Sequence, residues 1–146
     1  MISVILPTRN PHPGRLHRTL AGLAAQSLAR AHWELLLVDN GSEPALTTIG
    51  EPLLSALGAR LVAEPEPGLT SARLAGIRAA GGDILVFVDD DNVLAATYLA
   101  SVAERFAAAP ALAAAGGPVV PEWETPPPAW TREFHGLLAL RNLGPE

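Results

Sequence analysis

The sequence predicts an α/β fold, with an open, mostly parallel, twisted sheet and helices on both faces. Two observations predict it. Four short apolar runs recur within the first 90 residues, and segments with helical spacing of apolar residues separate them. The runs are continuously apolar and do not alternate with polar residues, which is typical of buried parallel strands. A length of 146 residues suits one compact folding unit.

Strands and helices are expected in regular succession. The apolar runs place strands at residues 2–6, 33–38, 60–63 and 84–88. The helix between the first two strands is marked by leucines at near-helical spacing, with Arg15 and Arg18 on its other face; these leucines are Leu16, Leu20, Leu23 and Leu28. Further helices are expected at 45–57 and 70–80, the latter ended by Gly81-Gly82 as a glycine C-cap.

The regular alternation of strands and helices ends after the fourth strand. A helix is expected at 95–109, stopped by Pro110, and residues 111–120 are predicted to return as a strand. Residues 121–130 are a proline-rich excursion that cannot form a central strand, and a short amphipathic helix follows at 131–140. We therefore divide the chain into an α/β domain at 1–120 and a separate part at 121–146.

Composition excludes several classes of protein. No segment reaches the roughly 20 apolar residues of a membrane span, and the N-terminus has no basic leader, so a cytoplasmic protein is expected. Net charge is −5 and the ten basic residues are scattered arginines, which disfavours nucleic acid polymers as partners. Because the chain has no cysteine, a bound metal ion would be a hard cation on oxygen ligands. Such a cation would also neutralise the charge of a phosphate ligand, since this acidic chain is short of positive charge.

Polar residues follow the predicted strands, at the sheet edge where such folds bind ligands. Pro7-Thr8-Arg9-Asn10 follows the first strand and Asp39-Asn40-Gly41-Ser42 the second. Residues 64–68 follow the third strand, and Asp89-Asp90-Asp91-Asn92 follows the fourth. Three of these four segments carry groups suited to a nucleotide.

The acidic triplet is the sharpest signal. Three adjacent carboxylates repel one another unless a cation or donor groups offset their charge. In an extended segment Asp89 and Asp91 would share a face, so Asp91, with Asp89, is expected to hold a metal while Asp90 meets a ribose hydroxyl. The alternative is that these acids cap the helix expected near Ala95, for which one aspartate would suffice.

Other candidates have ordinary interpretations beside the functional one. Asp39 and its neighbours suit a strand-to-loop turn, which taken alone we favour. Thr8 could bond its own loop, and Arg73, near the positive end of its helix, requires a partner such as Asp39 or a ligand. The four histidines have no metal-site spacing, and Trp123 and Trp130 are expected to anchor the proline-rich segment rather than to hold a sugar.

These residues together resemble the family 2 glycosyltransferases with the Rossmann-like GT-A fold. The matching segments are VILPTRN at 4–10, LLLVDNGS at 35–42, a long stretch at 66–92 that ends in VFVDDDN, and GGPV at 116–119. Each is weak alone, but all four occur in the family's order and cover nearly all of residues 1–120.

The resemblance implies a nucleoside-diphosphate sugar donor, often of the UDP type, bound with Mg²⁺ or Mn²⁺. By matched position it places Thr8 and Asp39, with Pro7 and Arg9, at the nucleoside, and Arg73 beside them. It gives Asp90 to the ribose and Asp91 to the metal. An acceptor hydroxyl, on a carbohydrate or glycolipid, would displace the diphosphate with inversion, at the inner face of a membrane with which the protein associates peripherally.

The sequence departs from the family after Val120, where the acidic motif of the general base is not found. Glu122, Glu124 and Glu133 do not stand in its context. We therefore expect a fragment of a larger enzyme that retains the donor site. Two alternatives stay open: a non-catalytic nucleotide-sugar-binding module, and an enzyme like the sugar-phosphate nucleotidyltransferases. The latter usually carry a glycine-rich loop with Arg and Lys after the first strand, and this chain contains no Lys.

Overall fold

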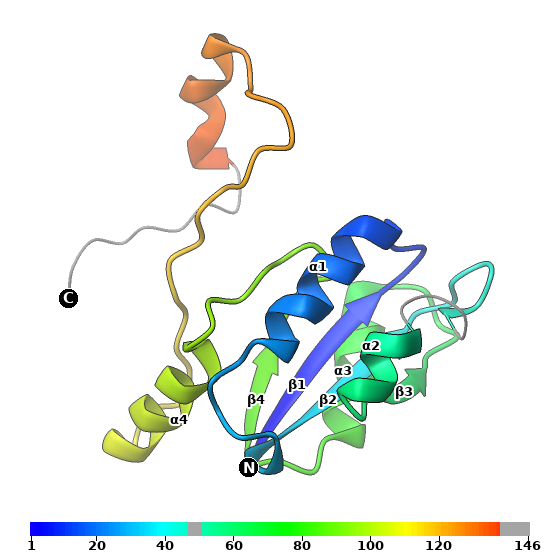
Figure 1. Ribbon diagram of the computed structural model, residues 1–146, viewed down its shortest axis with the longest axis vertical. Helices are drawn as coiled ribbons and strands as arrows, with labels where there is room; N and C mark the ends of the chain where they lie inside the picture. The colour runs from blue at the N-terminus through cyan, green and yellow to red at the C-terminus, as the bar shows by residue number, and fades with distance from the viewer. Residues whose placement is uncertain (47–50, 138–146) are drawn as a thin grey trace. The chain divides into compact units, whose positions relative to one another are not determined.

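The computed structural model describes residues 1–46 and 51–137. The chain divides into two compact units, Met1–Ala108 and Ala109–Glu146. The first unit is a four-stranded parallel sheet with helices on both faces, which confirms the predicted fold class (Figure 1). The division expected after residue 120, between a donor part and an acceptor part, stays a prediction.

Four parallel strands form the sheet in the order β3-β2-β1-β4. They are β1 (Ile2–Thr8), β2 (Trp33–Asp39), β3 (Arg60–Ala63) and β4 (Ile84–Phe87). Thr8 lies opposite Asp39 in the register, so β1 and β2 end at the same level. β1 runs two residues beyond its predicted end, which makes Thr8 part of the strand rather than of the loop.

The strands are not equally buried, contrary to the prediction of four buried strands. All seven residues of β1 are buried, as are all residues of β2 except Glu34. β3 and β4 are largely half-buried or exposed, because they form the two edges of the described sheet. An apolar run therefore predicted the strands correctly but not their position in the sheet.

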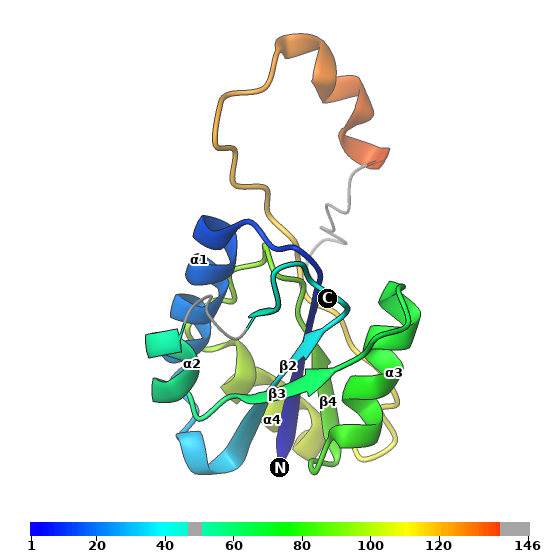
Figure 2. The same cartoon turned by 90° about the vertical axis from the view of Figure 1, so that its right-hand side faces the viewer.

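Three helices cover one face of the sheet and one covers the other (Figure 2). α1 (Pro13–Ala24), α2 (Glu51–Ala56) and α4 (Tyr98–Ala108) share a core with inward side chains of β1 and β2. α3 (Leu69–Ala79) packs alone against Ile5, Leu36 and Val38. Leu28 lies beyond α1 but packs against the first core, and residues 47–50 of the predicted second helix lie outside the described residues.

The expected glycine C-cap of α3 is wrong. The helix ends at Ala80, which is extended, and neither Gly81 nor Gly82 has a positive φ. Gly82 serves another purpose, since a Cβ there would lie 2.6 Å from the carbonyl oxygen of Met1. The glycine permits close approach of the backbone to the start of β1.

The strand predicted at 111–120 is also wrong. Only Val119 makes an isolated bridge, and the rest of this segment has no regular structure. Alanine and glycine, which dominate it, have low strand propensity, and apolar character alone did not compensate.

The second unit is described by itself. It contains a 3₁₀ helix, Ala129–Leu137, where a helix was expected at 131–140; residues 138–140 lie outside the described part. Trp123 packs against His135 with ring centroids 5.5 Å apart, and Trp130 meets Phe134 edge to face. These contacts fit the anchoring interpretation of both tryptophans. Within residues 1–46 and 51–137, no helix has the length and apolar character needed to cross a membrane.

Candidate functional site

A pocket of about 440 Å³ lies where β1, β2 and β4 end, at the sheet edge expected to bind a ligand. It is lined by four segments of the chain, through Pro7, Thr8, Arg9, Asn40, Gly68, Leu69, Ala72, Asp89, Asp90 and Asp91. Six of the eight predicted site residues are therefore brought together here. The other two, Asp39 and Arg73, are not among the lining residues.

The acidic triplet forms a turn rather than an extended segment. The N–H of Val88 makes the last bond to β1, to the carbonyl of Ile5 at 3.0 Å. The N–H of Asn92 then donates to the carbonyl of Asp89 at 3.1 Å, which closes a four-residue turn. The expectation that Asp89 and Asp91 share a face by strand alternation is wrong, because this turn brings all three acids to the pocket.

Asp90 is fixed by two threonines from other elements. The Thr8 hydroxyl donates to Asp90 Oδ2, and the hydroxyl of buried Thr19, on α1, donates to the Asp90 carbonyl at 3.0 Å. Thr8 is 5% exposed, and its partner is the acidic turn rather than its own loop. β1 and α1 therefore position the turn from two sides.

Arg73 pairs with Asp89, at 3.3 Å between Nη2 and Oδ1, and not with Asp39, which was one of the partners considered beside a ligand. Its guanidinium also lies 5.6 Å from the ring centroid of Phe87, while its Nε is buried without a hydrogen-bond partner among the described residues. Both charged side chains are more than a third exposed, so the pair itself is weak. Asp89 can therefore change partner at low cost when a ligand enters.

Asp39 shapes the loop that follows β2. Its Oδ1 accepts the N–H of Ser42 at 2.9 Å and its Oδ2 accepts the N–H of Leu46 at 3.2 Å. These bonds fit the turn interpretation of Asp39. The adjacent Asn40 lines the pocket instead, with Gly68, Leu69 and Ala72 from the start of α3.

Sequence reasoning missed these four residues. Asn-Gly after a strand signals only a turn, and the small or apolar residues of α3 carry no chemical signal of a ligand. Gly68 has a φ of 141°, which only glycine adopts readily, and this position alone could have suggested a special backbone requirement.

Helix capping does not explain the acids. α4 begins at Tyr98, well beyond the triplet, and its first turn contains no acidic residue. The N–H of Leu99 donates to Gln26 Oε1 at 2.9 Å, so a side chain from the segment after α1 caps this helix. The capping alternative is therefore wrong.

The carboxylates of the pocket fit a divalent cation that completes its coordination shell with phosphate oxygens. Asp89 and Asp91 are exposed carboxylates on the pocket wall. Across residues 1–46 and 51–137, no three His, Asp or Glu side chains gather closely enough to hold a cation by themselves. Mg²⁺ characteristically uses one or two carboxylates and completes its shell with substrate phosphates and water.

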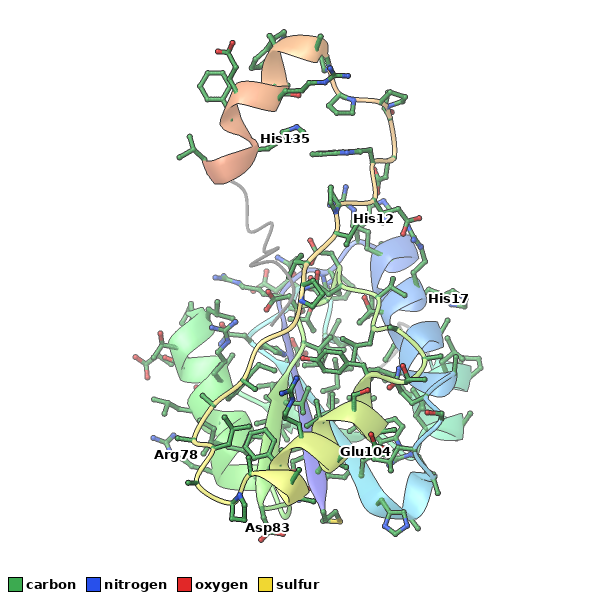
Figure 3. The ribbon with its side chains drawn as sticks, turned by 90° about the vertical axis from the view of Figure 1, so that its left-hand side faces the viewer. His12, His17, Arg78, Asp83, Glu104 and His135 are labelled. Carbon is green, nitrogen blue, oxygen red and sulfur yellow. The ribbon has the colours of Figure 1, made fainter. Side chains whose placement is uncertain are left out.

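The histidines take no part in the pocket. His12 and His17 are exposed on or beside α1, and His32 is exposed before β2, while His135 belongs to the second unit (Figure 3). This agrees with the expectation that they are surface or packing residues. The site depends on carboxylates, as the absence of cysteine suggested.

Comparisons with known proteins agree with this geometry. The family model described as glycosyl transferase family 2 matches residues 3–145. The succinoglycan biosynthesis protein ExoM of Rhizobium meliloti is 30% identical over 86% of this chain and 42% of its own length. A validoxylamine A glucosyltransferase of Streptomyces hygroscopicus is 31% identical over 70% of this chain and 24% of its own.

Solved structures share the fold. S. aureus TarS 1-349 in complex with UDP superposes with a TM-score of 0.65 and 25% identity, over 73% of this chain and 32% of that one. The mannosyltransferase PcManGT of Pyrobaculum calidifontis, in complex with GDP-Man and Mn²⁺, gives a TM-score of 0.61 and 26% identity over the same shares. This chain thus spans less than half the length of these relatives, and it belongs to glycosyl transferase family 2.

Proposed function

We propose that this chain forms the donor-binding part of a metal-dependent, inverting glycosyltransferase that uses a nucleoside-diphosphate sugar of the UDP type. One observation carries the proposal: three aspartates and the polar ends of β1 and β2 converge on one pocket. The solved relatives with UDP or with GDP-Man and Mn²⁺ support the same class of donor.

The pocket residues divide the work. Asp91 and Asp89 would hold Mg²⁺ or Mn²⁺ against the diphosphate, and Asp90, oriented by Thr8, would meet the ribose. Arg73 would turn from Asp89 towards the nucleotide once a cation occupies that carboxylate. The bound cation would offset the negative charge that develops on the leaving diphosphate.

The reaction proposed is a single displacement at the anomeric carbon by an acceptor hydroxyl of a carbohydrate or glycolipid. A carboxylate base would remove the hydroxyl proton, and attack opposite the diphosphate would invert the configuration. We assign the base to no residue of the described chain, because the pocket acids are the ones that we propose for the cation and the ribose.

Calorimetric titration of the 146-residue chain with UDP and with GDP, with and without Mn²⁺, tests the proposal. Asp91→Asn is expected to weaken Mn²⁺-dependent binding on the order of 100-fold, because a cation ligand is lost. The matched control is Asp83→Asn, since Asp83 lies at the opposite end of the sheet, where it pairs with the N-terminal amine (Figure 3).

Three outcomes separate the alternatives. Metal-dependent binding that Asp91→Asn removes and Asp83→Asn preserves would support the donor site. Equal losses in both variants, or no binding by the folded wild type, would overturn it. Binding without turnover of the sugar donor, with and without acceptors, would favour the non-catalytic binding module.

A further inference from the structure

Asn40 holds together three segments that are far apart in the sequence. Its N–H donates to the Thr8 carbonyl at 2.9 Å, which continues the pairing of β1 with β2. Its side-chain Nδ2 donates to the carbonyls of Glu64 and Glu66 at 3.0 and 2.6 Å, and its Oδ1 accepts the N–H of Gly68 at 2.7 Å. The residue is 4% exposed, and both donors and the acceptor of its carboxamide are in use.

The segment that Asn40 holds is one wall of the pocket. Gly68 has a φ of 141° and precedes α3, whose Leu69 and Ala72 also line the pocket. The Gly68 carbonyl accepts the N–H of Ala72 at 3.0 Å, so the position of Gly68 sets where the first turn of α3 begins. Two further bonds hold this loop: the Glu64 N–H donates to the Asp39 carbonyl at 2.9 Å, next to the last pair of β2 with β3, and the Glu66 N–H donates to Glu64 Oε1 at 2.8 Å.

The opposite wall is held mostly by other contacts, because its link to α3, the pair of Arg73 with Asp89, is more than a third exposed on both sides and therefore weak. Thr8 and Thr19 fix Asp90 in the acidic turn, and neither contact passes through residues 64–68. A change at Asn40 should therefore displace the α3 wall and leave the acids in place.

We infer that Asn40 is a positioning residue that sets the nucleoside wall of the pocket by fixing residues 64–68 and the start of α3. This inference rests on the proposed function. It assigns to Asn40 an effect on the nucleoside part of the ligand and none on the diphosphate and cation, which the acidic turn would bind.

Asn40→Asp is the informative variant because it changes shape least. It keeps an oxygen for the Gly68 N–H but places the other oxygen against two carbonyl oxygens, where Nδ2 now donates. Asn10→Asp is the matched control, since it introduces the same charge at the same sheet edge. Asn10 Oδ1 accepts a hydrogen bond from the N–H of Glu43 at 2.8 Å, and an aspartate carboxylate can accept the same bond.

Titrations with Mn²⁺–UDP and with Mn²⁺–pyrophosphate measure the two parts of the ligand separately. In Asn40→Asp, the affinity for Mn²⁺–UDP is expected to fall about tenfold, and the affinity for Mn²⁺–pyrophosphate to stay within about twofold of wild type. Asn10→Asp is expected to change neither affinity. Parallel loss of both ligands would indicate a merely structural role and overturn the inference, as would unchanged UDP binding.

Hydrogen exchange keeps the inference separate from the proposed function. Amide exchange at residues 64–69 should accelerate in Asn40→Asp and not in Asn10→Asp, because the Gly68 N–H loses its fixed acceptor. Unchanged exchange would overturn the inference even if wild type binds UDP. If wild type bound neither ligand, the proposed function would fail and the ligand role of Asn40 with it, whatever the exchange rates.

Discussion

The two ends of the sheet both carry carboxylates, but they use them differently. At the amino end, Glu34 Oε1 accepts the Ser3 hydroxyl at 2.7 Å and the Gly81 N–H at 2.6 Å. Glu34 Oε2 pairs with Arg60 at 3.1 Å, and the Ser3 hydroxyl in turn accepts the N–H of Gly82 at 2.9 Å. This carboxylate therefore has partners on both oxygens, all supplied by the protein.

At the carboxyl end, three carboxylates share far fewer donors. Asp90 takes one hydroxyl and Asp89 one half-exposed guanidinium, while Asp91 stands exposed on the same turn. Like charges so placed disfavour one another until an external cation arrives. The Glu34 network thus stabilises the fold, whereas the acidic turn leaves its charge available to the proposed cation.

The pKa of Glu34 reflects this closed network. Burial by itself raises the pKa of Glu34, but the bonds from Ser3 and Gly81 and the charge of Arg60 outweigh it and lower the pKa below its ordinary value. The network therefore favours the ionised carboxylate in the folded state. The network therefore stabilises the fold at neutral pH, and this contribution is lost as the pH falls through the lowered pKa of Glu34.

The largest effect on stability is expected from Gly82→Ala at the amino end. The added Cβ would lie 2.6 Å from the carbonyl oxygen of Met1 and 2.9 Å from the backbone nitrogen of Ser3. Both are backbone atoms, which cannot move aside as a flexible side chain can. We expect the free energy of unfolding in urea to fall by about 2–3 kcal/mol. Nucleotide affinity of the folded protein should not change.

Gly81→Ala is the control, because its Cβ would meet only flexible side-chain atoms, at 3.3 Å from Glu34 and 3.6 Å from Met1. A loss of nucleotide affinity in Gly82→Ala would contradict the separation of the two ends. Equal stability of the two alanine variants would show that the close approach at Gly82 is not needed.

A smaller, pH-dependent effect is expected from Glu34→Gln. Above the unfolded pKa, near the ordinary value of 4.5, the variant should be less stable than wild type by about 1 kcal/mol, because half-exposed Arg60 contributes little. As the pH falls through the lowered pKa of folded Glu34, wild type loses this advantage and the difference should vanish. Urea unfolding of both proteins from pH 7 to pH 3 measures it, and a constant difference would contradict the assignment.

An equally small effect on stability, but a clear one on binding, is expected from Thr8→Val at the carboxyl end. The variant keeps the shape of the buried side chain but removes the donor to Asp90 Oδ2. Affinity for Mn²⁺–UDP should fall about tenfold, since Asp90 loses its orientation, while the free energy of unfolding changes by about 1 kcal/mol. Calorimetry measures the affinity and urea unfolding measures the stability of the same variant. A large loss of stability with unchanged affinity would contradict the prediction and show that Thr8 serves the fold instead.

The sequence by itself determined the strands, the main helices and the segments that meet at the pocket. Continuous apolar runs located β3 at its observed bounds, and leucine spacing located α1, because both signals are local. The polar residues after each strand could be assigned to the ligand-binding edge because parallel strands end together. Where the signal was only apolar character, as at 111–120, the prediction failed.

Tertiary structure decided which of these residues meet. The order β3-β2-β1-β4 places β4 beside β1, and this neighbour relation brings Thr8 to Asp90 across 82 positions of sequence. Asn40 reaches Gly68 because β3 lies beside β2, and Arg73 pairs with Asp89 rather than with Asp39. Hydrogen bonds depend on distance and direction between groups, and those are set by sheet order and helix placement, which no local pattern of residues encodes.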